Sequence, residues 1–270
     1  MKFARGKVMP IIDADGCPIH VQVEGPEQAP VLMLSNSLAT TLDMWSPQVE
    51  PFTRQFRLVR YDRRGHGKSG VPKGPYTMER IGRDALAILD ALGLKTVNWC
   101  GLSMGGMVGQ WLGANAPDRI ERLVLSNTSC YFPDKTAWND RLKFVREKGV
   151  AALAGPNMER WFTNGFRERS PETIARMTVM FAATSLEGYI ACGAAVRDMD
   201  HRDLLPKIKA PTLVIIGRHD PATTPEAGEH IRSHIPGAVV TVLDAAHISN
   251  IEQPAAYTSA VLDFLSRPAV

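Results

Sequence analysis

A serine between two glycines is the strongest chemical signal in this sequence of 270 residues. The stretch Gly101-Leu102-Ser103-Met104-Gly105 follows a short apolar run at 96–100 and precedes a segment at 106–114 that is typical of a helix. A serine on a sharp turn between a strand and a helix is presented as a nucleophile. The flanking glycines are needed where side chains would collide with the neighbouring strand and helix. We therefore predict that Ser103 is a catalytic nucleophile.

A serine hydroxyl is a weak nucleophile until a base takes its proton, so a histidine is expected beside Ser103. His247 is favoured because it follows the last predicted strand, at 239–243, in a loop of small residues that can fold over the edge of a sheet. His230 and His234 stand four residues apart on a predicted helix, but no third metal ligand lies nearby, and we predict no metal site. The remaining histidines are His20, His66, His201 and His219.

The carboxylate that orients the histidine is expected between Ser103 and His247 in the chain. Asp220 follows the predicted strand at 211–217, so its loop and the His247 loop leave neighbouring strands. The alternative for Asp220 is a turn or a helix cap. The runners-up for the acid precede that strand and are Asp198, Asp200 and Asp203.

An oxyanion hole needs two backbone N–H groups near the nucleophile. Met104, directly after Ser103, is the first predicted donor. The second is expected in the polar loop at 35–40, which follows the apolar run at 31–34. We predict Leu38 as this donor, with Ala39 as the second choice.

Strands and helices alternate over most of the chain, which is typical of an α/β protein with a mainly parallel sheet and helices on both faces. Eight strands are predicted, at 5–12, 18–24, 31–34, 56–61, 96–100, 122–127, 211–217 and 239–243. Helices are predicted at 76–92, 106–114, from 224 onward and at 254–264.

Residues 130–205 lack this alternation. They read as helical segments rich in aromatic residues and methionine, with breaks at Pro133, Gly149, Gly155-Pro156 and Ser170-Pro171. We predict a helical cap at 130–205, inserted into a core formed by 1–129 and 206–270. Such residues line a pocket or pack the cap against the core, and helical spacing favours packing.

The loop from Asp62 to Gly70 carries four charged residues and three glycines. One interpretation is a cationic clamp for substrate. The other is a structural turn in which Asp62 and Arg64 hold the backbone, and this one is favoured because charges in a short glycine-rich loop usually hold its shape.

The composition is that of an ordinary globular protein and argues against several other classes. The apolar fraction of 44%, the charged fraction of 22% and the net charge of +3 are ordinary for a globular protein and do not favour nucleic acid as a partner. No apolar run is long enough to cross a membrane, and residues 1–7 are too polar for a signal peptide. The four widely spaced cysteines predict reduced thiols and a cytoplasmic protein. A homo-oligomer is possible, and the sequence does not decide the oligomeric state.

These stretches together resemble the α/β-hydrolase family over essentially the whole chain, and within it the group of 3-oxoadipate enol-lactonases. The similar stretches are LSNSL at 34–38, RYD at 60–62 with RGHG at 64–67, GLSMGGM at 101–107, AAVRDMD at 194–200, PTLV at 211–214, GRHDPAT at 217–223 and LDAAH at 243–247. Asn36-Ser37 replaces the His-Gly of many relatives, and Ala39 stands where glycine is often found.

The resemblance implies an enzyme of the β-ketoadipate pathway that hydrolyses a small anionic enol-lactone to 3-oxoadipate. It implies a Ser103–His247–Asp220 triad, an acyl-enzyme and no cofactor. Arg197 and Trp138 in the cap are then the expected contacts of the substrate. Another cap arginine, or Ser and Asn side chains with bridging water, are the alternatives to Arg197 for binding the substrate carboxylate. Two alternatives stay open: another carboxylesterase, lactonase or C–C bond hydrolase of the same fold, and a non-catalytic ligand-binding protein. Loss of a triad residue would indicate the latter, and none is lost.

Overall fold

A computed structural model describes residues 9–266 of the chain. Its eight strands form one sheet in the order β1-β2-β4-β3-β5-β6-β7-β8, in which β1–β2 and β2–β4 are antiparallel and the other pairs parallel. The strands are β1 (Ile11–Asp13), β2 (Pro18–Glu24), β3 (Val31–Ser35), β4 (Arg57–Tyr61), β5 (Val97–Leu102), β6 (Ile120–Ser126), β7 (Thr212–Gly217) and β8 (Val239–Leu243). The predicted eight-stranded, mainly parallel sheet is confirmed; residues 5–8 of its first predicted strand lie outside the described residues.

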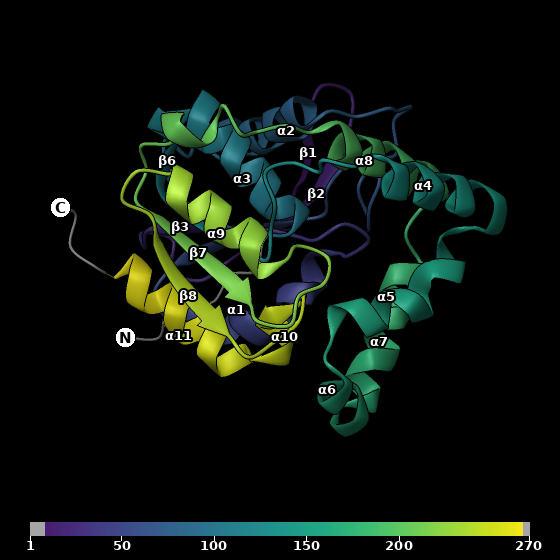
Figure 1. Cartoon of the computed structure of the whole chain (residues 1–270). Helices are drawn as coiled ribbons and strands as arrows, with labels where there is room; N and C mark the ends of the chain where they lie inside the picture. Colours follow the sequence, from purple (N-terminus) through teal and green to yellow (C-terminus); the bar gives the residue numbers. More distant parts are fainter. Residues whose placement is uncertain (1–8, 267–270) are drawn as a thin grey trace.

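The central strands are apolar on both faces because helices cover both faces of the sheet. Every residue of β5 and β7 is buried. Helices α2 (Met78–Ala91), α3 (Met104–Asn115) and α9 (Pro225–His234) lie on one face, and α1 (Ser46–Thr53) and α11 (Pro254–Leu265) on the other (Figure 1). Short 3₁₀ helices occur at Leu42–Trp45, Pro117–Arg119, Val150–Leu153 and Leu205–Lys207.

Five helices lie between β6 and β7 and gather at one end of the sheet, away from the chain termini (Figure 1). They are α4 (Thr136–Lys148), α5 (Ala154–Trp161), α6 (Asn164–Arg169), α7 (Pro171–Ala182) and α8 (Leu186–Asp198), and the short α10 (Ser249–Glu252) faces them. The breaks predicted at Gly149 and Ser170-Pro171 are confirmed. The break predicted at Gly155-Pro156 is wrong, because both residues lie in the first turn of α5, where proline is tolerated. The exact division into core and cap stays a prediction.

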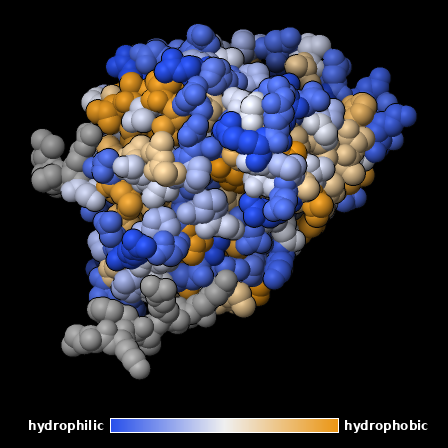
Figure 2. All heavy atoms as spheres, turned by 90° about the horizontal axis from the view of Figure 1, so that it is seen from below, coloured by the Kyte–Doolittle hydropathy of each residue, from blue (hydrophilic) through white to orange (hydrophobic). Residues whose placement is uncertain are grey.

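The face seen in Figure 2 is mostly polar, with apolar groups in scattered patches. None of the helices in residues 9–266 has both the length and the apolar character that a single membrane crossing needs. Helices α7 and α8 have the necessary length and apolar character only when they are taken together, and their axes are bent by 92° where they meet.

Candidate active site

Ser103 lies at the junction between β5 and α3, with a backbone conformation that side-chain-bearing residues rarely adopt (φ 57°, ψ −117°). Its amide donates to the carbonyl of Ser126 at 2.9 Å, which ties the turn to β6. A Cβ on Gly101 would collide with the backbone of Gly105, and a Cβ on Gly105 would collide with the backbone of Ser35. The two glycines are therefore required by the close approach of strand, helix and neighbouring loop.

His247 and Asp220 meet at the carboxyl edge of the sheet, after β8 and β7. His247 Nδ1 lies 2.8 Å from Asp220 Oδ2, and both side chains are buried. The Asp220 carboxylate also accepts hydrogen bonds from the Thr223 amide at 3.0 Å and the Thr223 hydroxyl at 2.7 Å. Burial by itself would raise the pKa of Asp220, but the charge of His247 and these hydrogen bonds lower it below its ordinary value of 3.8. The carboxylate thus selects the tautomer of His247 with a proton on Nδ1, which leaves Nε2 free to accept one.

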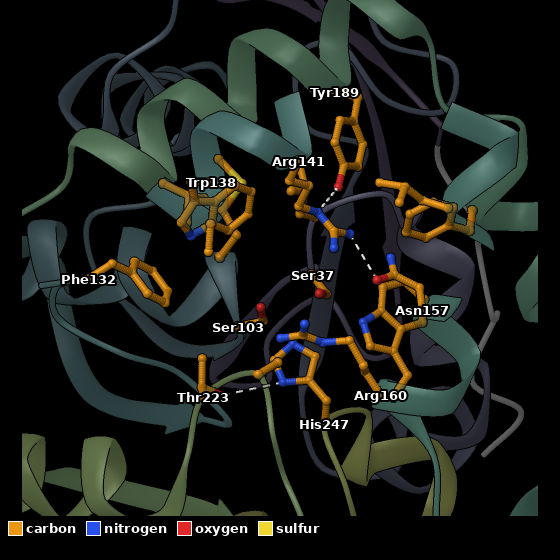
Figure 3. Close-up of a pocket in the computed structure, with 18 of the residues that line it drawn as sticks. Ser37, Ser103, Phe132, Trp138, Arg141, Asn157, Arg160, Tyr189, Thr223 and His247 are labelled. Carbon is orange, nitrogen blue, oxygen red and sulfur yellow. Dashed lines mark hydrogen bonds between the residues drawn. The ribbon is translucent and has the colours of Figure 1, made fainter. Parts of the chain in front are cut away.

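Of the seven histidines, all within the described residues, His247 alone lines the cavity that contains Ser103. The side chains of Ser103 and His247 both point into it (Figure 3). Within residues 9–266 no direct hydrogen bond joins the two, which is common for a serine and its base before a substrate binds. The runner-up acids Asp198, Asp200 and Asp203 do not line this cavity, and the first two pair with Arg197 and Arg202 on the surface.

The predicted oxyanion donors lie on both sides of Ser103. Leu38 and Met104 line the cavity, and among the described residues neither backbone amide has a hydrogen-bond acceptor. Met104 is the first residue of α3, where the amide has no partner within the helix. The amide of Ala39, the second choice, donates instead to His66 Nε2 at 3.0 Å. The geometry therefore favours Leu38 over Ala39.

Two arginines face the nucleophile across a cavity of about 560 Å³. Arg141, on α4, donates from Nε to the Tyr189 hydroxyl at 2.5 Å and from Nη2 to Asn157 Oδ1 at 2.9 Å (Figure 3). Its guanidinium also lies 5.7 Å from the ring centres of Trp138 and Tyr189. Burial, and then the positive charge of Arg141, lower the pKa of Arg160, on α5.

Neither arginine pairs with a carboxylate in the described part of the chain, although the exposed Asp134 and Asp140 also line the cavity. Unpaired guanidinium groups held by neutral side chains are suited to bind a carboxylate. The cavity therefore combines a nucleophile, a base and an anion-binding wall.

The structure corrects one predicted contact. Trp138 lines the cavity as expected, but Arg197 does not. The Arg197 guanidinium is paired with Asp198 at 2.7 Å and donates to Asn139 at 3.1 Å on the surface. The sequence left open that another cap arginine takes this place but did not identify Arg141 or Arg160, which line the cavity. The available signal was that Arg141 follows Trp138 by three residues, which places both on one helix face.

The loop from Asp62 to Gly70 contributes no side chain to the cavity. Arg64 forms a buried ion pair with Asp84, at 2.5 Å from Nε, and His20 Nδ1 lies 3.0 Å from Asp62. This agrees with the structural interpretation of the loop and not with a substrate clamp.

Comparisons with known proteins agree with this fold. A family model described as the alpha/beta hydrolase fold matches residues 30–254. The chain is 41% identical to 3-oxoadipate enol-lactonase 2 of Acinetobacter baylyi over 95% of this chain and 96% of that protein, and 38% identical to 3-oxoadipate enol-lactonase 1 of the same organism over 90% and 91%. The crystal structure of the enol-lactonase from Burkholderia xenovorans LB400 is similar, with a TM-score of 0.94 and 43% identity, covering 96% of this chain and 100% of that chain. The chain therefore belongs to the α/β-hydrolase family.

Proposed function

We propose that this protein hydrolyses 3-oxoadipate enol-lactone to 3-oxoadipate, a reaction of the β-ketoadipate pathway, and that no cofactor takes part. The observation that carries the proposal is the cavity in which Ser103 and His247 face Arg141, a cation without a carboxylate partner among the described residues. Such a cavity suits an ester that carries a carboxylate. The similarity to enol-lactonases at about 40% identity over nearly the whole chain narrows the ester to this lactone.

In the proposed first half-reaction, His247 Nε2 takes the proton of the Ser103 hydroxyl as Oγ attacks the lactone carbonyl. Negative charge then develops on the carbonyl oxygen, where the amides of Leu38 and Met104 stabilise it. The bond between the carbonyl carbon and the ring oxygen breaks. The ring oxygen leaves as an enolate, which takes up the proton held by His247 and tautomerises to the 3-oxo group, so that His247 is neutral again.

In the second half-reaction, His247 takes a proton from water, whose oxygen attacks the acyl-enzyme ester. The bond to Ser103 Oγ breaks, Oγ recovers a proton from His247, and a carboxylate is released. Asp220 stays ionised and stabilises the protonated imidazole in both halves. Arg141, assisted by Arg160, binds the carboxylate that the substrate already carries.

The helices between β6 and β7 take the role of a cap in this proposal, since Trp138, Arg141 and Arg160 come from α4 and α5. They limit access to small ligands. The four cysteines are unpaired and buried, which supports a reducing, cytoplasmic environment.

The test follows the ultraviolet absorbance of the enol-lactone with wild type and Ser103→Ala. We expect fast loss of absorbance with wild type and a decrease in kcat of about 10⁴-fold or more in the variant, because the acyl-enzyme cannot form. Slow turnover by folded wild-type protein would refute the lactone as substrate. Unchanged turnover in the variant would refute Ser103 as the nucleophile.

A further inference from the structure

The loop from Asp62 to Gly70 has no part in the mechanism above, yet it holds the loop that carries Leu38. The Asp62 carboxylate accepts a hydrogen bond from the Leu42 amide at 2.9 Å. The Arg63 guanidinium donates to the carbonyls of Asn36 at 2.5 Å and Ser37 at 3.3 Å. The loop at 36–42 is therefore bound on both sides of Leu38.

The carbonyl of Ser37 and the amide of Leu38 belong to the same peptide group. In a trans peptide the C=O and N–H bonds point in opposite directions, so fixing one fixes the other. Arg63 and the Thr40 hydroxyl, at 2.8 Å, both donate to the Ser37 carbonyl. The Leu38 N–H must then point away from Arg63 and Thr40.

The next peptide group is held by His66. The Ala39 amide donates to His66 Nε2 at 3.0 Å, and Ala39 has a positive φ of 61°, which is costly for a residue with a side chain. Without this acceptor the peptide between Leu38 and Ala39 could rotate toward a less strained conformation. Rotation there would also release the Ala39 amide to compete for the position of the oxyanion.

The surroundings of His66 keep its Nε2 as a hydrogen-bond acceptor for the Ala39 amide. His66 is buried, and its Nδ1 lies 3.3 Å from the carbonyl of Arg64, an acceptor that only a protonated Nδ1 can satisfy. Cys192 Sγ is farther away, at 4.0 Å from Nδ1. Burial, and then the positive charge of Arg63, lower the pKa of His66 to about 3. The ring is therefore neutral, with its lone pair on Nε2 toward Ala39.

We propose that His66 is a positioning residue for the reaction: by holding the Ala39 amide, it keeps the Leu38 amide directed at the oxyanion. The inference rests on the proposed hydrolysis, but it applies to any acyl transfer at Ser103. His66 contacts no substrate in this role.

The test compares His66→Gln with His66→Met. The two replacements have nearly the same length, but the glutamine oxygen is a strong acceptor for the Ala39 amide, whereas the methionine sulfur is only a weak one. We expect His66→Met to lower kcat by roughly 10- to 1,000-fold, because a misdirected oxyanion donor should cost at most the roughly 100- to 1,000-fold of a lost one, with KM changed less than about threefold. His66→Gln should recover most of the lost kcat.

Two further measurements distinguish an effect of His66 on the oxyanion hole from a loss of folding and from a wrong choice of substrate. Thr40→Val removes one of the two donors to the Ser37 carbonyl while nearly keeping the shape of the side chain, and it should lower kcat as well. Both kcat and the rate at which a p-nitrophenyl phosphonate labels Ser103 are measured, because labelling needs the oxyanion hole but not the enol-lactone. A wild type that reacts with the phosphonate but not with the lactone would refute the proposed function and leave the His66 comparison intact.

Wild-type kcat and labelling rate in His66→Met would overturn the inference. Equal losses in the Gln and Met variants would also overturn it, since the acceptor would then be irrelevant. If His66→Met does not fold, His66→Leu, which also lacks a strong acceptor, takes its place in the comparison with His66→Gln.

Discussion

The arginines of this protein differ in what their guanidinium groups contact. Several on the surface pair with carboxylates close in sequence, as Arg83 does with Glu79 and Arg202 with Asp200. Arg141 instead contacts the hydroxyl of Tyr189 and the amide oxygen of Asn157. These neutral partners fix the direction of the guanidinium without neutralising its charge. The anionic substrate that we propose would therefore find a cation already oriented and uncompensated, which reduces the cost of ordering the side chain on binding.

Replacing Arg141 by Met should raise KM for the enol-lactone by roughly 10- to 100-fold, because a hydrogen bond to a charged group contributes about 1.5–3 kcal/mol. We expect a smaller effect on kcat, since the carboxylate lies away from the reacting carbonyl. Steady-state kinetics beside Arg197→Met provide the check and the matched control. An equal rise in KM in both variants would remove Arg141 from the binding site.

At the scale of elements, Glu252 on α10 joins the His247 loop to the helices of the predicted cap. Its buried carboxylate accepts hydrogen bonds from the Ala246 amide at 2.9 Å, from the Thr163 amide at 3.1 Å and from the Thr163 hydroxyl. The Ile248 amide, on the other side of His247, donates to the carbonyl of Trp161 at 3.1 Å. The residues that flank His247 are thus bound to the segment between α5 and α6.

Glu252→Gln should loosen this connection, because an NH₂ group would replace one of the two accepting oxygens. We expect a loss of about 1–3 kcal/mol in the free energy of unfolding. We also expect faster hydrogen exchange at the amides of Thr163 and Ala246, measured by mass spectrometry or NMR. Glu121→Gln, at an exposed position of β6, is the control. Exchange rates equal to those of wild type would show that Glu252 does not hold the two segments together.

At the scale of the whole molecule, folding buries His66 and His201 as neutral groups. Burial, and then Arg63, lower the pKa of His66 to about 3. Burial lowers the pKa of His201 to about 4, although the nearby Asp200 raises it. Both values lie below the ordinary 6.5. Below pH 6.5 the unfolded chain therefore binds protons that the folded protein excludes, so the stability present above pH 6.5 is lost as the pH falls toward 4.

Each of these histidines should lower the free energy of unfolding by up to about 1.4 kcal/mol per pH unit in this range. Urea unfolding at pH 6.5, 5.5 and 4.5 measures how steeply the free energy of unfolding falls with pH. His201→Asn should give a shallower slope than wild type, because it removes one of the two buried groups that take up a proton on unfolding. A slope in His201→Asn equal to that of wild type would contradict the argument.

Short-range chemistry made much of this protein predictable from its sequence. The G-x-S-x-G turn is dictated by sterics, since Gly101 and Gly105 each meet a neighbouring backbone. The alternation of apolar strands with helices predicted the eight-stranded, mainly parallel sheet. Asp220 and His247 could be paired because the loops after neighbouring parallel strands share one edge, and their side chains indeed meet there at 2.8 Å. Their catalytic role together with Ser103 stays a prediction.

Only the tertiary structure decided which polar side chains face the cavity. Arg197, Arg141 and Arg160 all lie in the helices between β6 and β7. Apart from the spacing of Arg141 from Trp138, nothing in their local sequence separates a surface cation from one that faces Ser103. The choice depends on how those helices rotate and pack against the sheet, which involves contacts between residues distant in sequence. The same holds for His66, whose partner Ala39 lies 27 residues away. Periodicity and turn chemistry act through neighbours along the chain, whereas these pairings arise from packing across it.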